Sequence, residues 1–154
     1  MGLDLFPRRK TDPDATKATG RTHRADEPCP FASDDFPLAS TGTCCSLRGK
    51  VAAENLYALG ALDVCGLLHE DLDADRTLYV AARLRDAADH LEQRYEGQSE
   101  KPSGASFGGK IIAETGEFVP WPQPSFEEAI ASIREAADWY EKVGRLGFGV
   151  HAWY

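Results

Sequence analysis

The stretch SFEEAIASIREAADWYEKVGRLGFGVHAWY (residues 125–154) joins a helix pattern directly to a strand pattern. Ser125 and Glu128 stand three residues apart, as in a capping box at a helix start. We expect Gly144 to end the helix. After it, Phe148 to Tyr154 alternates between two sides, as a strand does. The sequence predicts a helix with one apolar stripe, followed by a closing strand; the stripe consists of Phe126, Ile130, Ile133, Ala137 and Tyr140.

The first residues, GLDLF (residues 2–6), show the same alternation, with Leu3 and Leu5 on one side. We expect Pro7 to end this strand, because proline cannot donate to a sheet. A lone short strand is not stable in water. We therefore predict that the N- and C-terminal strands pair in a small antiparallel sheet.

Two further helices and a hairpin are predicted between these ends. Residues 46–70 are apolar around most of a helix circumference, and Gly60 is expected to end or bend this buried helix. Asp73 is a suitable N-cap for a helix reaching about Tyr95. A loop follows, and residues 110–121 form a possible hairpin that closes at Thr115 and Gly116. We find no internal repeat. The expected fold class is α+β and mainly helical, with three principal helices and the small sheet in a single domain, residues 1–154.

The chain has a basic N-terminal segment and an acidic remainder. Residues 1–24 carry six Lys/Arg and three Asp, whereas residues 25–154 carry 11 basic and 22 acidic residues. Residues 7–43 are rich in Asp, Pro, Thr, Ser and Gly, so we expect a long, irregular and partly flexible segment. The basic residues could touch nucleic acid or simply be solvated. The acidic remainder makes nucleic acid an unfavoured partner.

The apolar runs in the sequence are too short to predict a membrane-spanning helix. No apolar run approaches the ~20 residues that a spanning helix needs. The N-terminus has no signal-peptide core. We therefore expect a cytoplasmic protein with no membrane partner.

Four cysteines raise the question of a metal site. Cys65 and His69 are four residues apart, and on a helix both could reach one zinc ion. Cys29 with Cys44 or Cys45 could complete a tetrahedral set. Adjacent cysteines diverge, however, and a cytosolic protein would not keep a disulfide. Reduced and packed thiols, a metal site at these five residues, a disulfide and a nucleophile are all open; we favour packed thiols and hence no cofactor, with zinc as the alternative.

Enzyme motifs are weak in this chain. Gly104, Gly109 and Lys110 match the core of a phosphate-binding loop, but Ile111 replaces the required Ser/Thr and a hairpin pattern follows in place of a helix. We interpret this stretch as a surface loop. The scattered His23, His90 and His151 are expected to be surface or partly packed residues. We therefore assign no catalytic and no cofactor-binding residue.

Three stretches of the chain are similar to a set of small proteins of bacteria and their phages. These are the opening MGLDLFPR (residues 1–8), LDADRTLYVAARLRDAADHL (residues 72–91) and WYEKVGRLGFGVHAWY (residues 139–154). The resemblance implies a phage-like or mobile-element accessory protein. No activity attaches to this set, so it implies no functional residues.

Three hypotheses about function follow from the sequence. The first is a non-enzymatic protein that docks on a protein partner through its acidic surface or its aromatic C-terminus. The second is a module stabilised by zinc or an iron–sulfur cluster at the cysteines. The third is an enzyme of unrecognised class.

Overall fold

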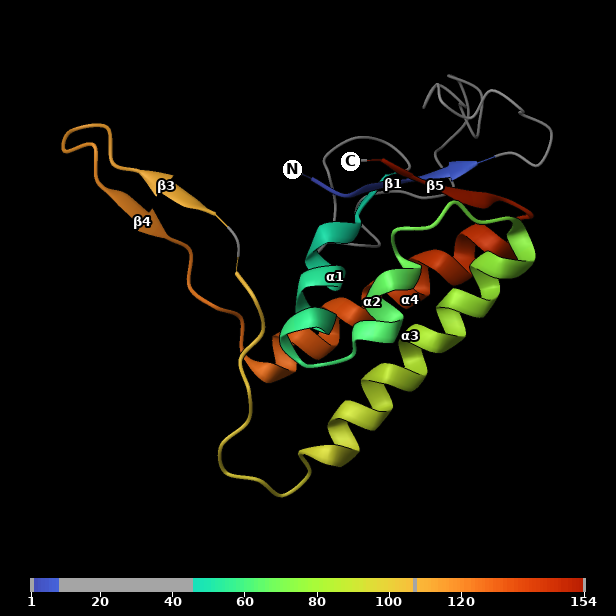
Figure 1. Ribbon diagram of the computed structural model, residues 1–154, viewed down its shortest axis with the longest axis horizontal. Helices are drawn as coiled ribbons and strands as arrows, with labels where there is room; N and C mark the ends of the chain where they lie inside the picture. The colour runs from blue at the N-terminus through green and yellow to red at the C-terminus, as the bar shows by residue number, and fades with distance from the viewer. Residues whose placement is uncertain (1, 9–45, 107, 154) are drawn as a thin grey trace.

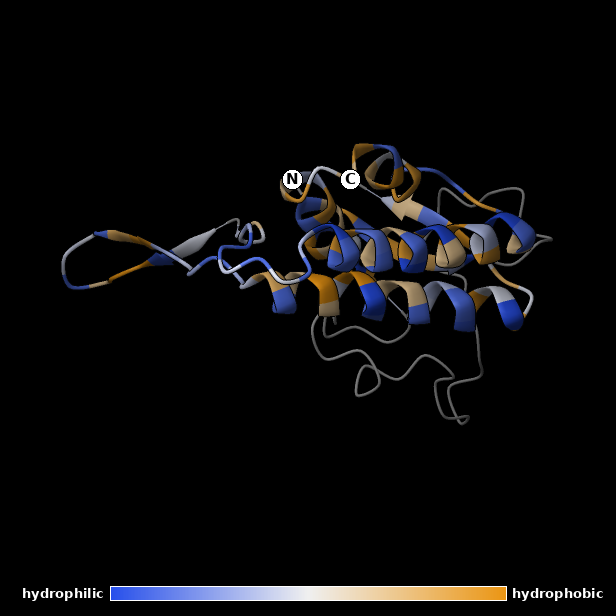
Figure 2. Cartoon of the chain, turned by 90° about the horizontal axis from the view of Figure 1, so that it is seen from below, coloured by the Kyte–Doolittle hydropathy of each residue, from blue (hydrophilic) through white to orange (hydrophobic). Residues whose placement is uncertain are grey.

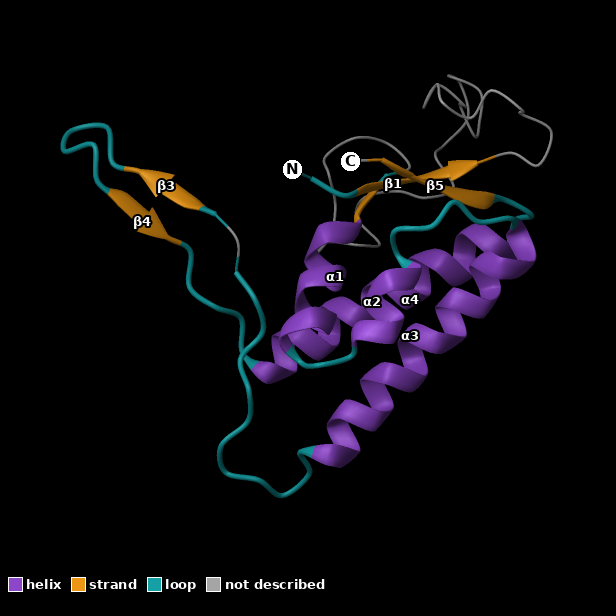
Figure 3. Ribbon diagram, viewed as in Figure 1, coloured by secondary structure: helices purple, strands orange, loops and turns teal. Residues whose placement is uncertain are grey.

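The computed structural model describes residues 2–8, 46–106 and 108–153, and these form an α+β fold in which helices predominate (Figures 1 and 3). The predicted fold class is confirmed. The elements in chain order are β1 (Asp4–Arg8), β2 (Leu47–Arg48), α1 (Gly49–Ala58), α2 (Leu62–Leu67), α3 (Ala74–Arg94), β3 (Gly109–Ile111), β4 (Phe118–Pro120), α4 (Phe126–Arg145) and β5 (Gly149–Trp153). The predicted irregular segment, residues 7–43, lies outside the described residues except at its start.

The terminal strands pair as the sequence predicts. β1 and β5 are antiparallel, with Leu5 opposite Ala152, and the strand order is β2-β1-β5. The short β2 was not predicted; it places Leu47 opposite Leu5. Leu5, Leu47 and Val150 are completely buried, so this sheet contributes to the same core as the helices.

The expectation that Pro7 ends the first strand is wrong, since β1 continues to Arg8. Val150, which lies opposite Pro7, directs its own N–H and C=O to Leu72, at 2.9 and 2.8 Å. The pair Pro7–Val150 is therefore a position without hydrogen bonds between the two strands, and no proline N–H is needed there. β2 pairs only with Asp4 and Leu5, so the other side of Pro7 carries no β2 pairing.

The apolar segment 46–70 forms two helices rather than one. Gly60 has φ +85°, a left-handed conformation that glycine adopts without strain, and it separates α1 from α2. The turn is closed by the Ala61 N–H, which donates to the Leu56 carbonyl at 2.8 Å. The predicted interruption at Gly60 is confirmed.

α3 and α4 begin at their predicted caps and pack against each other as an antiparallel pair. Asp73 Oδ1 accepts from the Arg76 N–H at 2.8 Å, and Ser125 with Glu128 forms the complete capping box. α4 is buried over more than its predicted stripe, because Ala129, Ser132, Ala136, Trp139 and Val143 are also buried. None of the described helices has the length and apolarity that crossing a membrane requires.

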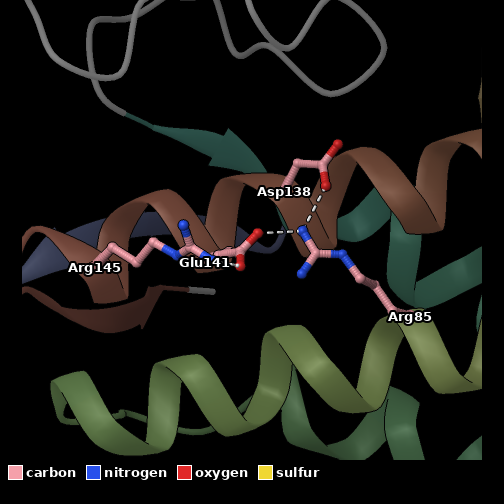
Figure 4. A network of polar contacts seen from close by, with 4 residues as sticks. All are labelled: Arg85, Asp138, Glu141 and Arg145. Carbon is pink, nitrogen blue, oxygen red and sulfur yellow. Dashed lines mark hydrogen bonds and ion pairs between the residues drawn. The ribbon is translucent and has the colours of Figure 1, made fainter.

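The α3–α4 contact reveals a short internal repeat that we missed in the sequence. RDAADHLE (residues 85–92) in α3 and REAADWYE (residues 134–141) in α4 share an arginine, two alanines, an aspartate and a glutamate at the same positions. Because the helices are antiparallel, each arginine meets the carboxylates of the other copy. Arg85 lies 2.7 Å from Asp138 and 2.5 Å from Glu141 (Figure 4), and Arg134 lies 2.8 Å from Asp89 and also pairs with Glu92. Glu92 thus belongs to this helix contact.

We expect Glu141→Gln to lower the free energy of unfolding by about 0.5–1 kcal/mol at pH 7, the scale of a partly exposed ion pair. The hydrogen bond from Arg85 holds the pKa of the Glu141 carboxyl below its usual value. The stabilisation is therefore fully present above the carboxyl's unfolded pKa and declines as pH falls through the lowered folded value. Urea unfolding of both proteins from pH 7 to pH 2 should show the difference shrinking. Glu114→Gln, away from the helix pair, is the control; an undiminished difference at low pH would contradict the assignment.

Candidate protein-binding surface

A two-stranded arm projects from the helical body between α3 and α4. We call residues 108–121, which comprise β3, β4 and their turn, the β-arm. Both views show it extending beyond the helices (Figures 1 and 2). The predicted hairpin is confirmed, with Lys110 opposite Val119. Its turn has Gly116 at φ +68°, and the Gly116 N–H donates to the Ile112 carbonyl at 2.8 Å.

The β-arm exposes three large apolar side chains. Ile111 is 70% exposed, Phe118 57% and Trp121 56%. Ile111 and Phe118 lie opposite each other, so they share one face. Pro120 shares the face of Phe118, because side chains alternate along a strand. Trp121 comes directly after Pro120 and therefore belongs to the other face. Apolar side chains thus stand in water on both faces of the hairpin, whereas a hairpin that served the core would bury one face.

The aromatic rings of the β-arm lie against its backbone. A Cβ on Gly109 would lie 2.6 Å from Phe118 Cζ, and one on Gly108 would lie 2.8 Å from Trp121 Cζ3. The Trp121 N–H also donates to the Gly108 carbonyl at 3.1 Å. The two glycines therefore leave room for the rings, which are held in defined positions while much of their surface remains in water.

The base of the β-arm is fixed to the body by a buried asparagine. Asn55 of α1 donates through Nδ2 to Ser132 Oγ of α4 at 2.7 Å, and its Oδ1 accepts from the Ala105 N–H at 3.0 Å. The Gly104 N–H donates to the Pro124 carbonyl at 2.9 Å, which brings the two ends of the arm together. Asn55 is 2% exposed. This side chain therefore sets where the arm leaves the body.

The surroundings of the β-arm are acidic. Residues 96–128 contain six glutamates and two lysines, a net charge of −4. One lysine, Lys101, is paired with Glu127 at 2.9 Å. On the arm itself Glu114 and Glu117 lie at the turn, and Lys110 lies in β3. The arm therefore combines exposed apolar side chains with a negative surround.

The proposed metal ligands are only partly within the described chain. Cys29, Cys44 and Cys45 lie outside it, so the metal hypothesis and its alternatives stay predictions. Cys65 of α2 is a free thiol that donates through Sγ to the Ala53 carbonyl at 3.3 Å. His69 is exposed and follows the end of α2. Across residues 2–8, 46–106 and 108–153, no group of three or more His, Cys, Asp or Glu side chains is arranged to hold a metal ion.

We expect Cys65 to react slowly with alkylating reagents in the folded protein. Partial burial raises the pKa of its thiol, so less thiolate is present at pH 8 than in a free cysteine. Site-resolved mass spectrometry after iodoacetamide treatment measures this rate, with the unfolded protein as the control. Equal rates in the folded and unfolded protein would contradict the packed-thiol assignment.

Three other residues that the sequence brought into question, Lys110, His90 and His151, lie within the described structure. Lys110 lies within β3, and a hairpin follows it, so the glycine-rich stretch does not lead into a helix. His90 is exposed, with Nδ1 2.7 Å from the Asp86 carbonyl; His23 lies outside the described residues. His151 Nδ1 lies 2.9 Å from Asp71 Oδ1, which also accepts from the Ala152 N–H at 3.0 Å. Asp71 therefore ties the loop before α3 to β5.

Comparison of the chain with protein-family models, with curated proteins and with solved structures gives no match. The fold class and the site's chemistry therefore carry the functional argument. The sequence drew attention to the acidic surface and the aromatic C-terminus, where Trp153 is 58% exposed. The β-arm was missed as a surface because alternation predicts a hairpin without predicting that it stands away from the body.

Proposed function

We propose that this protein is a non-enzymatic binding protein that attaches to a protein partner through the β-arm. The observation that carries this proposal is the exposure of Ile111, Phe118 and Trp121 on a projecting hairpin. Large exposed apolar patches mark interaction sites, and the few residues that dominate the binding energy of an interface are often aromatic.

The chemistry of the arm indicates the chemistry of the partner. Three large apolar side chains require an apolar groove. The net charge of −4 over residues 96–128 favours a groove flanked by Lys or Arg, because opposite potentials steer association.

Two further assignments belong to this proposal. The free Cys65 thiol supports a reducing compartment, and hence a cytoplasmic protein. The role of a phage-like or mobile-element accessory protein rests on the resemblance of residues 1–8, 72–91 and 139–154 alone.

A matched pair of variants tests the proposal. In the first, Phe118→Ser and Trp121→Ser are combined; in the second, Tyr57→Ser removes an aromatic side chain of α1 that is 67% exposed. Each protein is used to capture partners from an extract of its source cells, and captured proteins are quantified by mass spectrometry. We expect at least one protein to be captured by the wild type and by Tyr57→Ser, and to be reduced tenfold or more by the arm variant.

Equal capture by all three proteins would contradict a role for the β-arm. The melting temperature of each protein is measured as well. The arm variant should have the same melting temperature as the wild type, because both substituted side chains are largely in water. A lowered melting temperature together with lost capture would point to unfolding instead.

A further inference from the structure

The hydrogen bonds of the β-arm define which backbone groups point outward. The Trp121 N–H donates to the Gly108 carbonyl, and the Ile112 N–H donates to the Glu117 carbonyl at 2.8 Å. Hydrogen-bonded and non-bonded pairs alternate along an antiparallel hairpin. Lys110 and Val119, midway between these two bonded pairs, therefore form a hydrogen-bonded pair as well. The backbone groups of Gly109 and Ile111 in β3, and of Phe118 and Pro120 in β4, therefore point away from the hairpin.

The two outer edges of the β-arm are not equivalent. The β4 edge lacks a donor at Pro120, and Pro122 and Pro124 follow it. The β3 edge offers the N–H and C=O of both Gly109 and Ile111. Among the described residues, β3 pairs only with β4. Within the described part of the chain, the edge of β3 is therefore an open template for one more strand, and unpaired edges of this kind recruit extended chains.

We propose that an extended segment of another protein adds to the edge of β3 and continues the two-stranded sheet. This inference rests on the proposed function and specifies how the partner binds. Its backbone pairs with Gly109 and Ile111, and its apolar side chains at alternate positions extend the face of Ile111 and Phe118. Lys or Arg residues near the turn face Glu114 and Glu117.

A second copy of the chain fits this edge poorly. Full antiparallel pairing of β3 with β3 of another copy sets Gly109 opposite Ile111, and so sets Lys110 opposite the second Lys110. Like charges directly opposite each other in a sheet are destabilising. The net charge of −8 per chain also opposes self-association. A different protein, with a neutral or acidic residue opposite Lys110, avoids both penalties.

The test uses the full chain and a random heptapeptide library displayed on phage. Selected peptides are synthesised, and their affinities are measured for the wild type, Ile111→Ala and Ile111→Pro. Both variants lose the isoleucine side chain, but only proline removes the outward N–H, and proline is tolerated at such an edge position. We expect selected peptides to have alternating apolar residues, to slow amide exchange at Gly109 and Ile111, and to bind Ile111→Pro at least tenfold more weakly than Ile111→Ala.

Each other outcome has a distinct meaning. Equal affinities for the two variants, with the Gly109 amide unprotected, would overturn strand addition while leaving side-chain binding to the β-arm in place. Peptides that protect amides elsewhere, or no selected peptide above background, would overturn it as well. Dimerisation of the chain that Ile111→Pro abolishes would assign the edge to a second copy and reject the proposal.

Discussion

Gly149→Ala is expected to be the most damaging glycine-to-alanine substitution in the described chain, lowering the free energy of unfolding by more than about 4 kcal/mol. A Cβ at this position would lie 2.0 Å from the Leu72 carbonyl oxygen and 3.1 Å from Asp73 Cα. Both neighbours are backbone atoms, so no side-chain rotation relieves the overlap. β5 would have to move away from Leu72, which would break the two hydrogen bonds between Leu72 and Val150. The total free energy of unfolding of a native protein is only about 5–15 kcal/mol, so this loss is a large fraction of it.

Gly66→Ala is the matched control for this substitution. Gly66 is inside α2, and a Cβ there meets nothing within 4 Å. Alanine is favoured over glycine within a helix by up to ~1 kcal/mol, so the control should be neutral or slightly stabilising. Urea unfolding followed by circular dichroism compares the two. A Gly149→Ala protein as stable as the wild type would mean that β5 does not lie against Leu72.

Asn55→Ala is expected to lower the free energy of unfolding by about 2–4 kcal/mol, because it leaves buried polar groups without partners and opens a cavity. The Ala105 N–H loses its acceptor and Ser132 loses the Nδ2 donor. The consequence extends to the β-arm, since Ala105 stands at its base. Faster amide exchange at Ala105 should therefore accompany the lost stability.

Tyr57→Ala is the control for the asparagine, because Tyr57 lies on the same helix and is largely exposed. We expect a change within about 0.5 kcal/mol, as for most surface positions. If Asn55→Ala also fell within this range, the asparagine would not be the anchor that the hydrogen bonds indicate.

Local patterns predicted those parts of the fold that depend on neighbours in sequence. The caps at Asp73 and Ser125, the interruption at Gly60 and the hairpin at Gly116 all arise within a few residues. The pairing of the terminal strands was also predictable, because each strand was too short to be stable alone. These predictions use only the local conformational preferences of the residues and the need to bury one apolar face.

Features that depend on distant residues could not be predicted in the same way. The bond from Asn55 to Ser132 joins residues 77 positions apart, and the bond from Ala152 to Asp71 spans 81. Nothing in an isolated asparagine or aspartate indicates such a partner. The repeat in α3 and α4 was visible in the letters, but its meaning depends on the antiparallel packing that sets each arginine against the other copy's acids. Pro7 was misjudged because its tolerance depends on the hydrogen bonds of Val150.

We propose that the β-arm serves binding and contributes nothing to the stability of the body. Gly104, Ala105 and Pro124 close its base, so residues 108–121 can be replaced by a short Gly-Ser linker without touching these contacts. The most direct measurement is the melting temperature of this armless chain beside that of the intact protein. We predict that the two melt within about 2 °C, a difference below ~1 kcal/mol for a chain of this length. A fall of ten degrees or more would contradict the account, because it would show that the exposed residues of the arm are needed for the fold.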